Sequence, residues 1–138
     1  MARASWDAEF HPACESWTNG LGQADAEALV AAVRVLRAEG PSLGRPLVDT
    51  VKGSRYKNMK ELRPGSTGRS GVRVLFAFDK ERRAILLLGG DKSEDWDGWY
   101  KANVPMADDR FEEHQARIEE KMRVSAAGGS KARKGRRR

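Results

Sequence analysis

The sequence predicts an α+β fold, in which N-terminal helices pack on a small, twisted, mainly antiparallel sheet and a C-terminal helix follows. Three observations lead to this fold class. Apolar residues recur at three- and four-residue spacing in residues 23–40 and again in residues 108–122, as on amphipathic helices. Between them, residues 72–79 show the two-residue alternation of a strand, and residues 84–90 form a short apolar run. With 138 residues the chain suits a single domain with a buried core.

The N-terminal part is predicted to hold one short strand and two helical segments. Residues 5–12 suit a strand, and residues 13–19 suit a helical turn. The helix over residues 23–40 is rich in alanine, with Asp25 as a candidate N-cap and Gly40 followed by proline as its end.

The central part is predicted to form an antiparallel meander. Its strands are residues 56–63, 72–79 and 84–90, which are joined by a glycine-rich turn and a short charged connection. On the middle strand the large apolar side chains share one face, which we expect to pack on the helices. Arg73 is then expected on the opposite face, pointing toward a concave or solvated side.

Positive charge is concentrated at the C-terminus. Residues 121–138 hold eight of the 26 Lys and Arg and no acidic residue, which leaves 18 basic against 20 acidic residues in positions 1–120. The formal net charge of +6 therefore belongs to the end of the chain. We predict a folded domain over residues 1–122 and a disordered basic tail over residues 123–138.

A second group of cations lies inside the domain. From Lys52 to Arg73 the sequence has seven Lys or Arg and one acidic residue, Glu61. Arg73, with Lys60 and Arg63 on the preceding strand and Lys92 after the following one, could line one cleft and bind a phosphate. The alternative is that these cations only solvate a sheet face and discourage edge aggregation.

Aromatic side chains gather in residues 96–100. Trp99 and Tyr100 stand close to the cations, where rings could stack on the bases of single-stranded nucleic acid. The alternative is that a tryptophan covers the core. The Tyr100 hydroxyl could act as an acid or base if nearby cations lower its pKa.

Other kinds of site receive little support from the sequence. Cys14 has no partner for a disulfide, and no cluster of residues has metal-ligand spacing. His114 lies on an apolar helix stripe and is expected to be a core histidine. No apolar stretch is long enough for a signal peptide or a membrane span, so we expect a cytoplasmic protein without a cofactor or metal and without a membrane partner.

Several sequence blocks resemble a known family. "GPSLGRPLVDTVKGSRYKNMKELRPG", "RVLFAFD", "AILLLGGDKSEDWDGWY" and "ADDRFEEH" resemble, in order and spacing, the HigB-like, phage-derived branch of the RelE/ParE toxin superfamily. The resemblance runs from about Trp17 to His114. It implies the compact RelE-like fold, a type II toxin–antitoxin module with a helix-turn-helix antitoxin, and metal-independent cleavage of messenger RNA on the ribosome. In RelE-type enzymes the 2′-hydroxyl of the RNA attacks the adjacent phosphate.

The resemblance also implies roles for individual residues. Arg73 matches the strand arginine before the "VLF" run, Lys92 falls near a basic residue of the family, and Tyr100 falls near the tyrosine that acts as a base in RelE. Where RelE has paired lysines this chain has "MKEL", so that Glu61 stands where a cation is expected. The catalytic set predicted is Arg73, Lys92, Tyr100, Lys60 and Arg63, and the RNA-binding set is Lys57, Arg69, Trp99, Arg133 and Arg136.

Two other functions remain open at this point. A ParE-like toxin would share the fold and bind DNA gyrase without catalysis. A relative that binds RNA but has lost toxicity is the third possibility, and Glu61 is the residue that favours it. The cations predicted on the sheet favour the ribonuclease.

Overall fold

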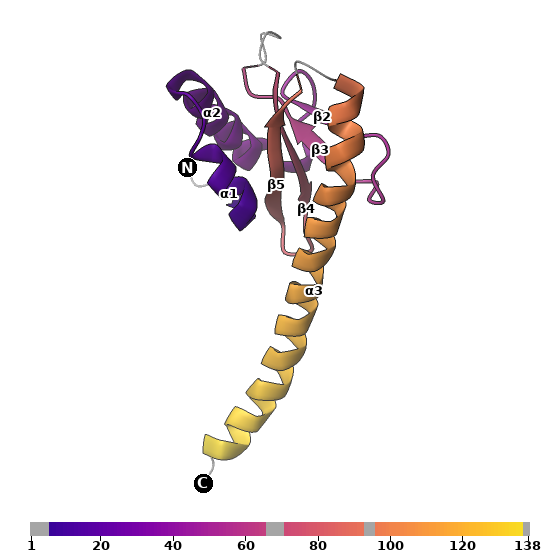
Figure 1. Ribbon diagram of the computed structural model, residues 1–138. Coiled ribbons are helices and arrows are strands. Elements are labelled where there is room, and N and C mark those ends of the chain that lie inside the picture. Colours follow the sequence, from indigo (N-terminus) through magenta and orange to yellow (C-terminus); the bar gives the residue numbers. More distant parts are fainter. Residues whose placement is uncertain (1–5, 66–70, 93–95, 137–138) are drawn as a thin grey trace.

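The computed structural model describes residues 6–65, 71–92 and 96–136 (Figure 1). In chain order its elements are β1 (Asp7–Phe10), α1 (Pro12–Thr18), α2 (Gln23–Glu39), a 3-10 turn (Gly40–Ser42), β2 (Val48–Thr50), β3 (Lys60–Leu62), β4 (Val72–Phe78), β5 (Arg83–Asp91) and α3 (Trp96–Arg136). The predicted α+β class is confirmed, and α1, α2, β4 and β5 lie close to where the apolar patterns placed them.

The sheet has five strands in the order β1-β5-β4-β3-β2. β2, β3, β4 and β5 pair antiparallel, as expected, but β1 pairs parallel with β5, so the sheet is mixed. The parallel pair arises because α1, α2 and the other strands intervene between β1 and β5, and such a long connection can bring two strands side by side in the same direction. The predicted strand over residues 56–63 is shorter than expected, because a turn from Tyr56 to Met59 precedes β3.

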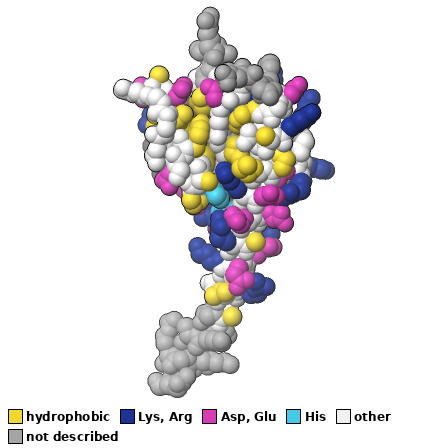
Figure 2. Space-filling view, in the orientation of Figure 1, with side chains coloured by type: hydrophobic (Ala, Val, Ile, Leu, Met, Phe, Trp, Pro, Cys, Tyr) yellow, Lys and Arg dark blue, Asp and Glu magenta, His cyan; other side chains and the backbone are white. Residues whose placement is uncertain are grey.

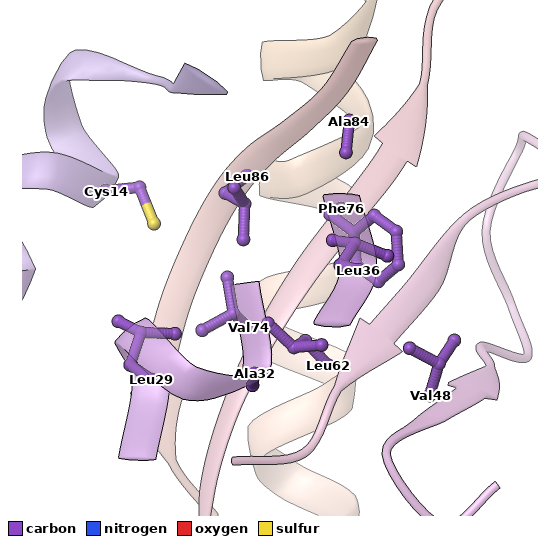
Figure 3. Close-up of a cluster of buried hydrophobic side chains, with 10 residues drawn as sticks. All are labelled: Cys14, Leu29, Ala32, Leu36, Val48, Leu62, Val74, Phe76, Ala84 and Leu86. Atoms are coloured by element: carbon purple, nitrogen blue, oxygen red, sulfur yellow. The ribbon is translucent and has the colours of Figure 1, made fainter. Parts of the chain in front are cut away.

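Helices cover both faces of the sheet (Figure 1). Leu29, Ala32 and Leu36 of α2 pack with Val74 and Phe76 of β4 in one apolar core (Figure 3). On the other face, Val104, Ala107 and Phe111 of α3 pack with the side chains of Leu75, Ala77, Ile85 and Leu87. The predicted alternation of β4 is therefore correct, but the face that carries Arg73 is buried under α3 and is not a solvated surface.

The last helix begins twelve residues earlier than the predicted start at Asp108, since α3 runs from Trp96 and contains Pro105. Its first turns are held by burial of Val104 and Ala107 against the sheet. Asp108, the predicted start of the helix, lies inside α3 and binds a loop. Its carboxylate accepts hydrogen bonds from the Ser54 hydroxyl at 2.5 Å and the Arg55 backbone N–H at 2.9 Å, which anchors the loop before β3 to the helix.

The C-terminal segment is helical where the sequence predicted disorder. α3 continues through Arg136 and projects away from the body (Figure 1). Its last buried side chain is Ile118, and residues 119–127 are exposed. The prediction of disorder rested on charge and glycine content, but alanine, lysine and arginine are also strong helix formers. The domain boundary at residue 122 stays a prediction.

At the β4–β5 turn, a buried carboxylate ties the sheet to α3. Asp79 lies 2.9 Å from Nε2 of His114 and accepts hydrogen bonds from the Arg83 side chain and from the backbone N–H groups of Glu81 and Arg83. Burial raises the pKa of the Asp79 carboxyl, but these hydrogen bonds outweigh burial and hold the pKa below its ordinary value. His114 is thus a core histidine, as expected, stacked on Phe111.

Asp79→Asn is expected to lower the free energy of unfolding at neutral pH by about 3 kcal/mol, the low end of the range for a broken buried ion pair. Because the folded pKa of Asp79 is depressed, its stabilisation is present above the unfolded pKa and is lost as pH falls through the folded pKa. Urea titrations of wild type and variant should therefore converge well below about pH 4. Glu9→Gln is the matched control, because Glu9 binds the same Arg83 from a half-exposed position. An equal loss in both variants would contradict this assignment.

Candidate functional site

Four polar side chains meet between the sheet and the start of α3, near the end of β5. They are Glu61 of β3, Arg73 of β4, Lys92 directly after β5, and Tyr100 of α3, and we refer to them as the Glu61 cluster. The Tyr100 hydroxyl donates a hydrogen bond of 2.5 Å to Oε1 of Glu61, and Nε of Arg73 lies 3.9 Å from the same oxygen. Glu61, Arg73 and Lys92 are buried, and Tyr100 is partly exposed.

Strand register brings the acid and the guanidinium together. β3 and β4 pair Glu61 with Leu75, so Arg73, two residues away on β4, is the diagonal neighbour of Glu61 on the same face. The Arg73 side chain also donates from Nη1 to the Val72 carbonyl at 2.8 Å, which fixes part of the guanidinium against its own strand.

A glycine allows α3 to approach this face. Gly90 pairs with Arg73 across β4 and β5, and a Cβ atom at Gly90 would lie 2.5 Å from Nε1 of Trp99. The Trp99 ring therefore rests on bare backbone. Its neighbour Tyr100, whose ring meets that of Trp99 edge to face, is thereby brought within reach of Glu61.

The electrostatics of the cluster assign protonation states. Burial lowers the pKa of the Lys92 amine, and the positive charge of Arg73 lowers it further, while Glu61 opposes this. Burial also raises the pKa of the Tyr100 phenol, and the hydrogen bond and charge of Glu61 raise it more than Arg73 lowers it. The condition set for Tyr100 as an acid or base, a pKa lowered by nearby cations, is therefore not met, because burial and a carboxylate dominate. Tyr100 is a protonated donor at neutral pH.

Comparison with known proteins shows the family of this chain. The model of the phage-derived Gp49-like proteins matches residues 16–112, which include the whole Glu61 cluster. The chain belongs to the Gp49-like family. The candidate toxin HigB2 of Mycobacterium tuberculosis is 48% identical over 140 residues, covering 87% of this chain and 70% of that protein. The candidate toxin HigB3 of the same organism is 50% identical over 101 residues, covering 73% of this chain and 86% of that protein.

Solved structures support the fold assignment. A mutant of the E. coli toxin RelE in the free state superimposes on this Gp49-like protein with a TM-score of 0.52, at 14% identity, over 69% of this chain and 90% of that one. The RelE of an archaeal RelE–RelB complex from Pyrococcus horikoshii gives a TM-score of 0.50 at 12% identity, over 64% of this chain and 97% of that one. At such identities the likeness establishes the RelE-type fold, which the sequence blocks implied.

Two cations predicted for the catalytic set lie apart from the cluster's centre. Lys60 alternates with Glu61 on β3 and projects to the opposite face, where its amine donates to the Pro41 carbonyl at 3.1 Å. Arg63 shares the Glu61 side of the strand but its guanidinium lies 3.8 Å from Asp49, at the edge of the cluster. Strand alternation excludes Lys60 from the cluster, and a catalytic role of Lys60 stays a prediction.

The predicted RNA-binding residues of this Gp49-like protein are scattered. Lys57 is exposed in the loop before β3, and Trp99 is partly buried against the α3 core. Arg69 lies outside the described residues. Arg133 and Arg136 lie on the last turns of α3, where side chains are outside the described part of the structure. Their role in binding RNA stays a prediction.

Glu61 is the site residue that the sequence analysis underestimated. It was interpreted as a missing cation, whereas it contacts both Arg73 and Tyr100. One signal could have found it, because alternation along β3 places Glu61, and not Lys60, on the face of Arg73.

The described residues do not support a metal site, a thiolate nucleophile or a membrane span. Among them, no group of three His, Cys, Asp or Glu could hold a metal ion. Burial raises the pKa of the Cys14 thiol to about 12, so Cys14 is not a thiolate nucleophile at neutral pH. The described helices contain no stretch with the length and hydropathy that crossing a bilayer requires.

Proposed function

We propose that this Gp49-like protein is the toxin of a type II toxin–antitoxin system and that it cleaves messenger RNA bound to the ribosome. Two relatives that are 48% and 50% identical over the matched residues are described as candidate toxins, and the fold is that of RelE. The observation that carries the proposal is the placement of two cations, Arg73 and Lys92, beside an acid and a phenol on one sheet face. That set can bind a phosphodiester and move a proton.

The reaction uses the RNA's own nucleophile. The 2′-hydroxyl attacks the adjacent phosphorus, and negative charge grows on the phosphoryl oxygens in the transition state. Arg73 and Lys92 stabilise that charge in a site that excludes much of the water, where such interactions are strongest. Tyr100 contributes its hydroxyl as a hydrogen-bond donor.

The ribosome and the message are the proposed nucleic-acid partners. On the side of the molecule that Figure 2 shows, acidic and basic side chains are interspersed along the described part of α3, so this side offers no uniform basic face there. The cations from residue 121 onward, with Arg133 and Arg136 among them, would hold ribosomal RNA by charge alone. Such binding weakens steeply with salt and has no sequence preference.

The second proposed partner is a helix-turn-helix antitoxin. A solved relative of the fold is a RelE–RelB complex. Beside α2 lies an apolar groove of about 580 Å³, lined among others by Phe10, Leu21, Val30, Val33, Arg34 and Arg37. Two arginines and no acidic side chain line it. We therefore assign it to an apolar segment of the antitoxin that also carries acidic residues.

Val30→Asp is expected to weaken antitoxin binding about 10-fold or more, because it places a charge in the apolar contact and repels acidic residues. Val30 is 57% exposed, so the substitution should leave the fold intact. Met122→Asp is the matched control, since Met122 is 56% exposed but lies far along α3. Titration calorimetry with the purified antitoxin measures both. Wild-type affinity of Val30→Asp would exclude this groove.

Induced expression in a bacterial host tests the proposed function. Primer extension on an abundant message should reveal cuts inside translated regions soon after induction, with growth arrest. Growth arrest with intact messages would exclude the ribonuclease and favour the ParE-like alternative, to be assayed by gyrase supercoiling. Normal growth with intact messages would favour the non-toxic relative.

A further inference from the structure

We propose that Glu61 is the group that takes the proton from the attacking 2′-hydroxyl, with Tyr100 as the residue that positions its carboxylate. This inference rests on the proposed ribonuclease activity and names the proton acceptor of that site. It arises from the position of a buried carboxylate at the centre of a cationic cluster.

The surroundings of Glu61 explain how a charge is tolerated there. Arg73 approaches from β4 and Tyr100 from α3, while Lys92 adds its charge from the end of β5. Arg63 on the same strand and Arg45 in the preceding loop contribute positive charge from further away. A buried carboxylate is costly unless cations and donors compensate it, and these groups supply that compensation. One carboxylate oxygen receives the Tyr100 hydrogen bond, which leaves acceptor capacity for a substrate hydroxyl.

The other members of the cluster are poorly suited to accept a proton. Arg73 is cationic at any working pH. Tyr100 already holds its proton and donates it to Glu61, and its pKa is raised above the ordinary value. Lys92 contributes positive charge, and its ammonium has no lone pair to accept a proton. Within the cluster, the Glu61 carboxylate is therefore the group left to act as the base.

The proposed step balances in atoms and charge. The 2′-hydroxyl passes its proton to Glu61 while its oxygen forms a bond to phosphorus. The bond between phosphorus and the 5′-oxygen of the next nucleotide breaks, and its electron pair stays on that oxygen, which takes a proton from solvent. The products are a 2′,3′-cyclic phosphate and a free 5′-hydroxyl. Glu61 then passes its proton to solvent.

Tyr100 acts through Glu61 as a positioning residue. Its hydrogen bond of 2.5 Å fixes one carboxylate oxygen. Tyr100→Phe removes only this donor. Cleavage per folded molecule should then slow moderately, with affinity for the programmed ribosome unchanged. A purely structural role of Tyr100 would lower the melting temperature and leave the rate per folded molecule unchanged.

The test uses the full-length protein with ribosomes programmed with a defined message. Single-turnover cleavage and affinity for the programmed ribosome are measured for wild type, Glu61→Gln, Glu61→Asp and Tyr100→Phe. Glu61→Gln should cut about 100-fold or more slowly, as expected for loss of a general base. Its affinity should be equal or higher, because Arg73 loses a competing carboxylate. Glu61→Asp should restore part of the rate.

Three outcomes separate the possibilities. If wild type does not cut, the proposed function fails. If wild type cuts and Glu61→Gln cuts equally fast, the assignment of Glu61 is overturned, and tighter ribosome binding would then mean that Glu61 only neutralises Arg73. If Glu61→Gln does not fold, Glu61→Asp decides. The proposal predicts a reduced rate per folded molecule, because the shorter side chain moves the carboxylate away from the 2′-hydroxyl, and an unchanged rate would overturn it.

Discussion

Arg73→Ala is expected to reduce cleavage of ribosome-bound message by about 100-fold or more, as for removal of a donor aimed at transition-state charge. The guanidinium is 5% exposed, and it is fixed by the Val72 carbonyl and lies close to Glu61. The guanidinium is thus held in one position beside Glu61 before any substrate binds, as preorganised stabilisation of phosphoryl charge requires. Arg73→Lys should lie between alanine and wild type, because it keeps the charge but loses the planar fork.

The control for Arg73 must be an arginine whose loss costs stability without touching the cluster. Arg83 fits, since it bonds Asp79 and Glu9 at the opposite end of β5. Single-turnover rates are compared at equal amounts of folded protein, as measured by thermal melting. Arg83→Ala should lower the melting temperature and keep the rate per folded molecule. Equal losses of rate in both variants would show that stability, and not the cluster, controls cleavage.

The second large effect concerns the packing of α3. Phe111 is completely buried, its ring meets Tyr56 edge to face with centroids 5.0 Å apart, and it stacks on His114. Phe111→Ala should lower the free energy of unfolding by about 3–5 kcal/mol, through lost burial and the cavity left behind. That is a large share of the roughly 5–15 kcal/mol of an ordinary domain.

Met122→Ala is the control for Phe111, because Met122 lies on the same helix but is 56% exposed. Its effect should stay within about 0.5 kcal/mol, as for most surface substitutions. Urea unfolding followed by circular dichroism measures both. A loss below about 1 kcal/mol for Phe111→Ala would contradict the packing of α3 on the sheet.

Local apolar patterns were sufficient to predict the helices and strands that bury one face against the core. The apolar spacing of α2 and the alternation of β4 predicted both elements within a residue or two. The face of Arg73 was also predicted correctly. The parallel pairing of β1 with β5 was not, since it depends on a connection through most of the chain.

The start of α3 was missed because glycine and proline weaken its local helical signal. Gly98 and Pro105 both lie within its first turns, and packing against the sheet overrides their low helix propensity. The late predicted start of α3 also affected the predicted position of Tyr100 in the site. The sequence predicted the last helix only over residues 108–122, outside which Tyr100 lies, whereas the helix aims the Tyr100 hydroxyl at Glu61.

The sequence selected three members of the Glu61 cluster but not its acid. Arg73, Lys92 and Tyr100 could be selected from their order along the chain. The alternation along β3 could have indicated the face of Glu61, but its contacts with Arg73 and Tyr100 require the register of β3 on β4 and the close approach of α3 over Gly90. Those are tertiary facts, and no local pattern contains them.

The most direct test of the central claim is a message with a single 2′-deoxy nucleotide at the mapped cleavage position. Purified protein, ribosomes and two otherwise identical messages are compared in one assay. We predict that the all-ribose message is cut to a 2′,3′-cyclic phosphate and that the 2′-deoxy message stays intact at that position. Cutting of both messages at the same position and rate would contradict attack by the 2′-hydroxyl and, with it, the proposed role of the Glu61 cluster.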